Sequence, residues 1–341
     1  SQDPPAQMLG LLDQLAEVCD PGTKVMVIGR ANDIALYREL MRRGVSEYLV
    51  PPFGPLDLIG SITTLYADPS APFLGRSIAF VGAKGGVGAS TVAHNFAHAM
   101  TDHMQSNAVI VDFDLPFGTA GLDFNQDPPQ GIAEAIFAPE RLDANLVDRL
   151  LSKCSDNLSL LAAPAMLDRT TDLVETALDG LFDILRASVP CIILDVPHLW
   201  TAWVRRTLIG ADEIAIVAAP ELASLRNTKN LFDSLRQARP NDRKPKIVLN
   251  QVGLPKRPEI SAADFAKALG TEIFSSLPFD AQLFGTAANN GQMIAEVQPA
   301  GKITEAFGEL AAAMTGRSEP KRAKANLLEP ILARLARRKA S

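Results

Sequence analysis

A glycine-rich loop sets the strictest limit on how this chain folds. Residues 80–100 read FVGAKGGVGASTVAHNFAHAM, in which four glycines separate an apolar stretch from a run of helix-forming residues. The residues before Gly82 predict a buried strand, and those after Gly88 predict a helix. In a strand–loop–helix unit of this kind, backbone amides surround phosphate oxygens at the positive end of the helix. The sequence therefore predicts a phosphate site, and an ordinary strand-to-helix turn is the simpler alternative.

The loop lacks one cation that nucleotide-binding loops usually carry. The residues expected to bind the nucleotide are Gly82, Lys84, Gly85, Gly86, Val87, Gly88, Ala89, Ser90 and Thr91. Ala89 stands where a lysine normally reaches the β- and γ-phosphates, so a charge-assisted contact worth about 1.5–3 kcal/mol is missing. Lys84 partly compensates for that loss. The Ser90 hydroxyl is placed to bind Mg²⁺.

Length and pattern together predict two α/β domains. The chain has 341 residues, of which 47% are apolar, and a net charge of −6. We expect a partial domain over residues 1–66, a linker over 67–76, a second domain over 77–316 and a basic tail over 317–341. Apolar stretches alternate with helical patterns in the second domain, which predicts a doubly wound, mostly parallel sheet. The expected strands cover 77–81, 107–113, 158–162, 190–196, 212–218, 245–251 and 272–276, and the expected helices cover 89–103, 142–153, 172–187, 200–210, 223–238, 261–269 and 302–315.

Cysteine spacing and apolar run length bear on where the protein acts. Cys19, Cys154 and Cys191 have neither metal-site nor redox spacing, which is typical of thiols in a reducing compartment. No apolar run reaches the roughly 18 residues of a membrane span, and no secretory signal is recognisable. We therefore expect a cytoplasmic protein. The tail carries eight Lys or Arg and two Glu, so it could contact an anionic membrane peripherally, bind a partner or do neither.

Three aspartates follow predicted strands. Asp112 and Asp114 occur in VIVDFDLP, and Asp195 ends CIILD. Because ligands of open α/β sheets bind at the carboxyl ends of the strands, we expect these carboxylates near the loop, where they could meet magnesium or water. Asp195 in particular is placed to hold the Mg²⁺ shell through water. Helix caps or turn residues are the alternative for each aspartate taken singly.

Three histidines invite other interpretations. His94 and His98 lie one helical turn apart, which is metal-ligand spacing, but the glutamate of a zinc-protease pattern does not accompany them. We therefore do not expect a metal there. His198 follows Asp195 and is expected to lie on the surface.

The stretch AKGGVGAST resembles the deviant phosphate loop of the MinD/ParA family of P-loop ATPases, in which a lysine stands directly before Gly-Gly. The resemblance implies ATP and Mg²⁺ as cofactors and a homodimer in which Lys84 reaches the partner subunit's nucleotide. It also implies that Asp114 orients the attacking water and that Asp112 lies near the metal. The residues expected around the adenine base are Asn250, Pro278 and Asp280, and Asn250 as a turn former is the alternative. Leu199 stands where the family has a glycine, which together with Ala89 favours a weak ATPase.

Residues 1–66 resemble the second half of a response-regulator receiver domain. The resemblance rests on DIALYRELMRRGVSEYLVPP. After a first helix over 6–19, we expect a strand over 24–29, a helix over 32–44, a strand over 47–50 and a helix over 54–67. Val50 or Pro51 replaces the receiver's lysine, and the phosphoacceptor aspartate is not present. We therefore expect an interaction or dimerisation module rather than a phosphorylation switch.

The combination of a degenerate receiver with this loop resembles the CpaE/TadZ proteins of tight-adherence (type IVc) pilus assembly. The segment LPFDAQLFGTAANNGQMIAEVQP supports the resemblance. It implies an ATP-dependent dimeric scaffold, with slow hydrolysis, that localises pilus assembly at the inner membrane or a cell pole. Its partners would be the pilus assembly ATPase and inner-membrane platform proteins. The alternatives are a ParA/MinD-like positioning ATPase on DNA or membrane and a scaffold without hydrolysis, and the acidic body of the chain argues against DNA.

Overall fold

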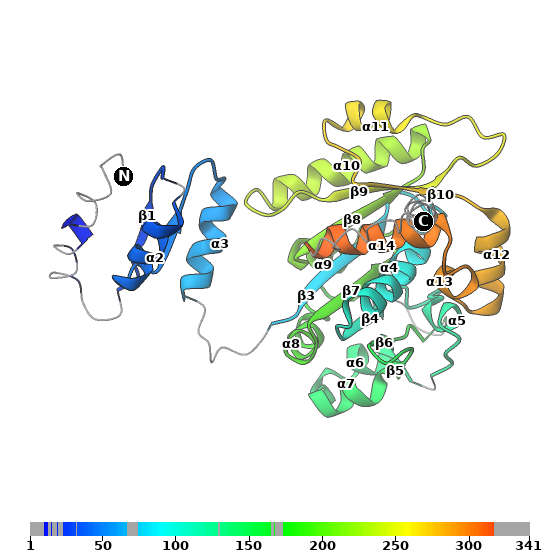
Figure 1. The fold of residues 1–341 in the computed structure, drawn as a ribbon. Helices are drawn as coiled ribbons and strands as arrows, with labels where there is room; N and C mark the ends of the chain where they lie inside the picture. Colours follow the sequence, from blue (N-terminus) through cyan, green and yellow to red (C-terminus); the bar gives the residue numbers. More distant parts are fainter. Residues whose placement is uncertain are drawn as a thin grey trace, which may run out of the picture. The chain divides into compact units, whose positions relative to one another are not determined.

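The chain divides into two compact units, Ser1–Pro72 and Phe73–Ser341, which are described separately. The computed structural model describes residues 10–12, 15, 19, 23–31, 33–66, 74–128, 130–164, 167 and 173–316. The basic tail, 317–341, and most of the expected first helix therefore lie outside the described residues. Figure 1 shows the order of the elements along the chain.

The first unit contains one pair of parallel strands. β1 (Met26–Ile28) and β2 (Glu47–Leu49) pair so that Val27 lies opposite Tyr48. α2 (Ile34–Arg42) follows the first strand, and α3 (Pro55–Tyr66) follows the second, as expected. Among the described residues of this unit, the buried hydrophobic side chains are those of Val27, Leu36, Leu40, Val45 and Tyr48.

An eight-stranded sheet forms the centre of the second unit. Its strands are β3 (Arg76–Gly82), β4 (Ala108–Asp112), β5 (Ser152–Lys153), β6 (Leu158–Leu161), β7 (Cys191–Val196), β8 (Glu213–Ala218), β9 (Lys246–Val252) and β10 (Ser275–Pro278). Their order across the sheet is β10-β9-β8-β3-β7-β4-β6-β5, and only the edge strand β5 is antiparallel to its neighbour. β3 lies between β8 and β7, so the loop that follows it opens at the middle of the sheet.

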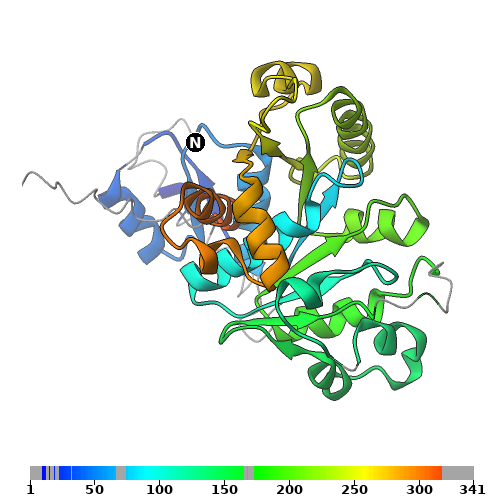
Figure 2. The same ribbon diagram turned by 90° about the vertical axis from the view of Figure 1, so that its right-hand side faces the viewer.

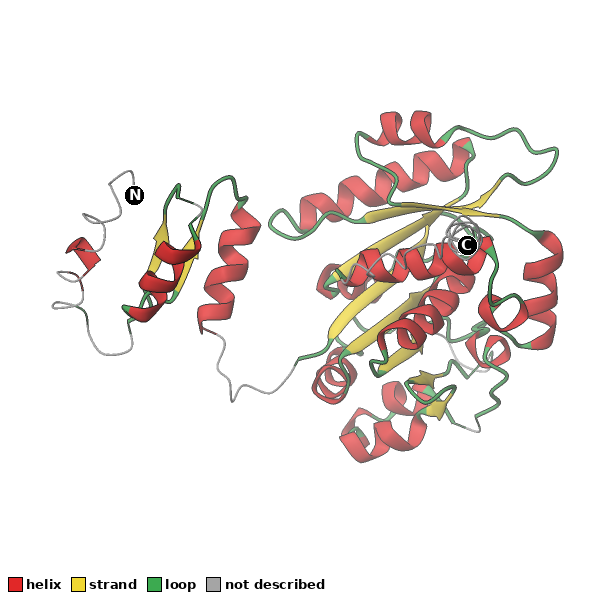
Figure 3. Cartoon of the chain, in the orientation of Figure 1, coloured by secondary structure: helices red, strands yellow, loops and turns green. Residues whose placement is uncertain are grey.

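Helices cover both faces of this sheet, as the layers in Figure 3 show. α4 (Ala89–Met104), α5 (Ala120–Asp123), α12 (Ala281–Asn290), α13 (Ile294–Val297) and α14 (Lys302–Thr315) pack on one face, around residues such as Phe80 and Ile110. α6 (Ile132–Phe137), α7 (Ala144–Leu150), α8 (Asp179–Ser188), α9 (Ala202–Gly210), α10 (Leu222–Ala238) and α11 (Ala262–Leu269) pack on the other, around residues such as Val111 and Ile216. The predicted doubly wound, mostly parallel α/β fold is thereby confirmed. α5 and α12 lie on the side of this unit that faces the viewer in Figure 2.

Some predicted elements differ from those observed. The helix expected over 142–153 ends at Leu150, because Ser152 and Lys153 pair with β6 as an edge strand. The last strand covers 275–278 instead of 272–276. Residues 281–290 form α12, which had been expected to be a loop. Asp280 caps its start, and Gly291, with a φ of 61°, ends it.

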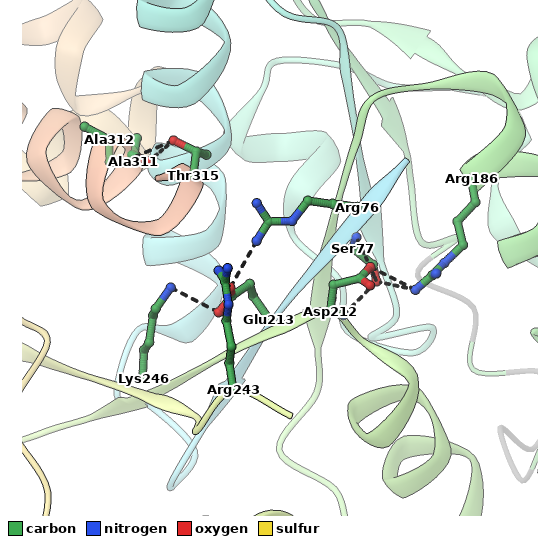
Figure 4. Close-up of polar contacts among 10 residues, drawn as sticks. All are labelled: Arg76, Ser77, Arg186, Asp212, Glu213, Arg243, Lys246, Ala311, Ala312 and Thr315. Carbon is green, nitrogen blue, oxygen red and sulfur yellow. Dashed lines mark hydrogen bonds and ion pairs between the residues drawn. The ribbon is translucent and has the colours of Figure 1, made fainter. Parts of the chain in front are cut away.

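Charged side chains cluster at the amino ends of β3, β8 and β9 (Figure 4). The glycine-rich loop follows the opposite end of β3. The buried Glu213 carboxylate pairs with Arg76 at 3.0 Å, Arg243 at 2.6 Å and Lys246 at 3.0 Å. Beside it, Asp212 accepts hydrogen bonds from the hydroxyl of Ser77 and from Arg186. This group ties the first residues of three neighbouring strands together.

Within the part of the chain that the structure describes, no helix combines the length and apolar character needed to cross a membrane.

Candidate nucleotide-binding site

The loop between β3 and α4 has a backbone that requires glycine at two positions. Gly86 and Gly88 have φ angles of 80° and 79°, in the left-handed region that other residues rarely adopt. A Cβ on Gly88 would lie 2.6 Å from Nδ2 of Asn250. Gly88 is also the N-cap of the 16-residue helix α4, and no side chain caps that helix. The first amides of α4 therefore remain available to an anion, and the helix dipole favours one there.

Four side chains hold the loop from outside. Asn250 donates to the Val87 carbonyl at 2.8 Å, and Gln251 donates to the Gly86 carbonyl at 2.9 Å. Asn227 of α10 donates to the Ala83 carbonyl at 2.9 Å. The Nδ1–H of His198 donates to the Gly82 carbonyl at 2.8 Å. These bonds engage four carbonyls of the loop and stabilise its shape.

These contacts change the interpretation of two residues. Asn250 was expected at the adenine base, but its amide is committed to the loop backbone, although it also lines the cavity described below. His198 is exposed, as expected for a surface histidine, and its ring also links the segment after β7 to the end of β3. Its position three residues after Asp195 was the signal in the sequence.

Lys84 projects from the loop and is held by an acidic side chain. Its Nζ lies 2.5 Å from a carboxylate oxygen of Glu221, the N-cap residue of α10. The two side chains are 44% and 31% exposed, so solvent reaches the pair. Ala89 starts α4 and packs against the core beneath it. Lys84 is therefore positioned at the edge of the loop, and no cation replaces it at position 89.

Asp112 and Asp195 lie opposite each other at the carboxyl ends of β4 and β7, and both are buried. The Asp112 oxygens accept hydrogen bonds from the amides of Asp114 at 3.0 Å and Ala120 at 3.1 Å. Burial, together with the neighbouring charge of Asp195, raises the pKa of Asp112 to about 7. Asp114 is half-buried, and burial raises its pKa as well. The strand ends thus bring the three predicted aspartates together, in surroundings that favour a bound cation.

His94 supplies a positive charge that the sequence did not lead us to expect. The ring is fully buried; Nδ1 lies 2.7 Å from Asp123, and Nε2 lies 3.1 Å from Asp195. Burial lowers the pKa of His94, but the hydrogen bonds and charges of Asp123 and Asp195 outweigh that effect and raise it to about 10. The ring is therefore an imidazolium at neutral pH, with both N–H groups donating.

A cavity of about 330 Å³ opens beside the start of α4. Its walls include Thr91, Asp123 and Asn250, with Phe279 and Phe284 stacked on each other at 5.7 Å and 11°. A flat aromatic ring system fits a cavity of this size and composition. Pro278 and Asp280, expected at the base, do not line the cavity; the Asp280 carboxylate instead accepts hydrogen bonds from the amides of Gln282 and Leu283 at the start of α12.

The oxygen-bearing side chains near the loop fit a magnesium ion that is bound together with phosphate. Among the described residues, no three His, Cys, Asp or Glu side chains are grouped so that they could enclose a metal. Mg²⁺ typically binds through one or two carboxylates or hydroxyls, substrate phosphates and several waters. Ser90 at the start of α4 and Asp195 provide such donors.

Four large apolar side chains are exposed after the carboxyl ends of β4, β7 and β8, the same end of the sheet at which the loop follows β3. Their exposed fractions are 67% for Phe117, 47% for Leu199, 50% for Trp200 and 74% for Leu222. Leu199 and Trp200 also line a cavity of about 390 Å³ against α10. We call these four residues the apolar rim. Large side chains exposed in one region are typical of a surface that binds another protein.

Comparisons with known proteins agree with this geometry. Residues 75–248 match the family described as AAA domain. Over 255 residues, the chain is 25% identical to the septum site-determining protein MinD of Synechocystis sp., a match that covers 72% of this chain and 92% of the relative. A solved structure of a ParA family ATPase from Chlorobium tepidum is 27% identical, with a TM-score of 0.61, over 70% of this chain and 98% of that one. The fold is also that of Pyrococcus horikoshii MinD, solved with Mg-ADP, at 20% identity and a TM-score of 0.62 over 71% of this chain and 96% of that one.

Proposed function

Because this chain belongs to the AAA-domain family, as a P-loop ATPase of the MinD/ParA type, we propose that it binds ATP with Mg²⁺ and that ATP joins two copies of it. The dimer serves as a scaffold for the assembly of a tight-adherence pilus, and slow hydrolysis resets it. The observation that carries nucleotide binding is the loop, in which Gly86 and Gly88 adopt left-handed angles and four side chains hold the carbonyls. That arrangement leaves the first amides of α4 for phosphate oxygens.

Different residues at the site bind the phosphates, the base, magnesium and the attacking water. The loop amides bind and orient the phosphates, and the cavity between Thr91 and the stacked pair Phe279 and Phe284 takes the base. Ser90 and Asp195 hold magnesium or its waters, which neutralise phosphate charge when the metal is bound. Asp114, half-buried beside Asp112, orients the attacking water. Since Ala89 contributes no charge, we expect hydrolysis to be slow.

Dimerisation is supported by two features around the loop. Lys84 lies at the edge of the site, where its ammonium group can leave Glu221 and reach a nucleotide held by a second copy. The apolar rim gives the same face side chains that lose water on association. The dimer would therefore form across the two nucleotides, with Lys84 of each copy serving the other.

The pilus role is supported by the resemblance of the first unit to a receiver domain and by the segment that forms β10, α12 and α13. In the described first unit, two parallel strands and two helices enclose a small core of Val27, Leu40 and Tyr48. A small α/β unit of this kind suits protein–protein contact rather than catalysis. We propose that it contacts the pilus assembly ATPase or the inner-membrane platform.

DNA binding is the competing function, and the basic segment over residues 236–246 is the feature that would support it. In the structure, Arg239 pairs with Asp242, and Arg243 and Lys246 pair with Glu213. These ion pairs leave less positive charge for phosphates of a nucleic acid. A scaffold that binds proteins therefore agrees better with the surface.

Two measurements test the proposed function. Isothermal titration of the full chain with ATP and Mg²⁺ should show one site per chain, and heat indistinguishable from dilution would contradict nucleotide binding. Immobilised full chain should retain the purified pilus assembly ATPase when ATP is present and lose it with Lys84→Ala. Retention that is equal with and without ATP would argue for a scaffold that does not respond to nucleotide.

A further inference from the structure

His94 lies where three elements of the second unit meet. The residue is on α4, one helical turn after Ser90. Its Nδ1 donates to Asp123 on α5 at 2.7 Å, and its Nε2 donates to Asp195 at the end of β7 at 3.1 Å. The Phe124 ring packs against the imidazole, with centroids 5.5 Å apart. Because the ring is rigid and both nitrogens are engaged, it connects two carboxylates that lie far apart in the sequence.

The two connected carboxylates belong to different parts of the site. Asp195 is 5% exposed and lies opposite Asp112, at the end where magnesium would bind. Asp123 is 22% exposed and lines the nucleotide cavity together with Thr91 and Asn250. One side chain, His94, therefore forms a polar connection between the cavity and the magnesium end.

We propose that His94 is a positioning residue, which couples the occupancy of the nucleotide cavity at Asp123 to the orientation of Asp195 toward magnesium. The inference rests on the proposed function, because it requires a nucleotide in the cavity. Hydrogen bonds in a chain polarise one another, so the strength of one bond depends on the other. A nucleoside in the cavity covers Asp123, excludes water and so strengthens the bond between Asp123 and His94. The ring then holds Asp195 less firmly, and Asp195 is free to turn toward magnesium.

A purely structural role for His94 makes a different prediction. If the ring only compensated buried charge, a change at Asp123 would lower the stability of the fold. Nucleotide affinity would then change by the same factor with and without Mg²⁺. If His94 couples the two acids, loss of the Asp123 charge leaves His94 bound more firmly to Asp195, and Asp195 then binds magnesium less well. The gain in nucleotide affinity on adding Mg²⁺ would therefore fall.

The test measures the Kd of a fluorescent ATP analogue, mant-ATP, for the full chain in EDTA and in Mg²⁺. The ratio of the two constants reports how much Mg²⁺ tightens binding. Asp123→Asn should lower this ratio at least about fivefold, the usual lower limit for coupling between sites. Asp127→Asn removes the same charge from an exposed position in the following loop and should leave the ratio unchanged.

A double-mutant cycle then isolates the part played by His94. In a His94→Gln background, Asp123→Asn should change the ratio less than twofold, whereas His98→Gln, one turn further along α4, should leave the effect of Asp123→Asn intact. An equal effect of Asp123→Asn in all backgrounds would overturn the inference. If His94→Gln does not fold, the comparison of Asp123→Asn with Asp127→Asn decides alone. Absence of mant-ATP binding to the wild type would overturn the proposed function itself, whereas Mg²⁺-dependent binding with an unchanged ratio would overturn only this inference.

Discussion

Lys84 and Ala89 determine how much positive charge the nucleotide meets. One lysine remains at the loop, and it is paired with Glu221 rather than pointing freely into solvent. To contact a nucleotide bound by a second copy, Lys84 must break its ion pair with Glu221 and bind phosphate oxygens instead. Because the pair is partly exposed, breaking it costs little, and Glu221 competes only weakly with nucleotide.

Glu221→Gln should make dimerisation easier. Without the carboxylate, Lys84 no longer has an ion pair to break, so the ATP concentration that gives half-maximal dimer should fall about two- to fivefold. Sedimentation velocity at a series of ATP concentrations measures this value. Glu140→Gln, at an exposed position in the short 3-10 helix Pro139–Arg141, is the matched control. A higher ATP requirement for Glu221→Gln would mean that Glu221 positions Lys84 for its task instead of restraining it.

Ala89→Lys should restore the missing contact. A charge-assisted bond to the phosphates is worth about 1.5 kcal/mol or more, which corresponds to at least about tenfold tighter ATP binding. Ala89→Met adds a chain of similar length without charge and should not tighten binding. Calorimetric titration of both variants distinguishes the effects. Equal affinities for the two variants would show that charge at position 89 is not what the site lacks.

Single functional residues were predictable where the neighbouring sequence marks them and unpredictable where only packing brings them together. The three aspartates were found because they follow apolar strands, and the structure places them together at the strand ends. For His94 the sequence offers only its metal-ligand spacing with His98, because burial beside Asp195 depends on how α4 packs over β7. No spacing along the chain encodes a contact between residues 94, 123 and 195.

The backbone of the glycine-rich loop requires glycine at some positions and not at others. Gly85 and Gly88 both belong to it, but their surroundings differ. A Cβ at Gly85 would meet nothing within 4 Å, whereas one at Gly88 would collide with Asn250 on a backbone that has a positive φ. The structure therefore separates a glycine that is required from one that tolerates replacement.

Gly88→Ala should abolish tight nucleotide binding, and Gly85→Ala should retain it. The first change strains the backbone and displaces Asn250 from the Val87 carbonyl, which alters the position of the α4 amides. We expect ATP affinity to fall more than about tenfold for Gly88→Ala and less than about threefold for Gly85→Ala. Titration with mant-ATP gives both values. Equal loss in the two variants would contradict the conformation of the loop.

The central strands and the long helices were predictable because they are continuous and strongly patterned. β7 and β8 are fully buried and apolar except for Asp195 and Glu213, and α10 has one apolar face. The errors fell at edges and short elements. α12 carries clear end signals, Asp280 and Gly291, but the resemblance of this segment to a family loop obscured them. β5 contains two residues and depends on β6 for its existence, so local sequence does not specify it.

The two ends of the parallel strands carry different groups of residues. The loop, the aspartates and the apolar rim lie at the carboxyl ends, whereas the Glu213 cluster lies at the amino ends. A buried carboxylate with three cationic partners joins β3, β8 and the segment before β9. These ion pairs therefore help to hold together the strands whose carboxyl ends carry the nucleotide-binding residues.

Glu213→Gln should destabilise the second unit without altering the site directly. Replacing the buried carboxylate should cost about 1.5–3 kcal/mol in charge-assisted hydrogen bonds, because Arg76 and Arg243 are partly exposed and water compensates the charges that remain. Urea unfolding followed by circular dichroism should show this loss, and Glu309→Gln on the exposed side of α14 should show almost none. A Glu213→Gln variant as stable as the wild type would indicate that Arg76 and Lys246 find other partners or water.

We propose that ATP joins two copies of this chain and that Lys84 is required for this contact. Size-exclusion chromatography with light scattering gives the mass of the wild type and of Lys84→Ala with and without nucleotide. We expect the wild type to double its mass when ATP and Mg²⁺ are added, and Lys84→Ala to remain monomeric although it still binds ATP. A mass that does not respond to ATP in either protein would show that nucleotide does not join two copies.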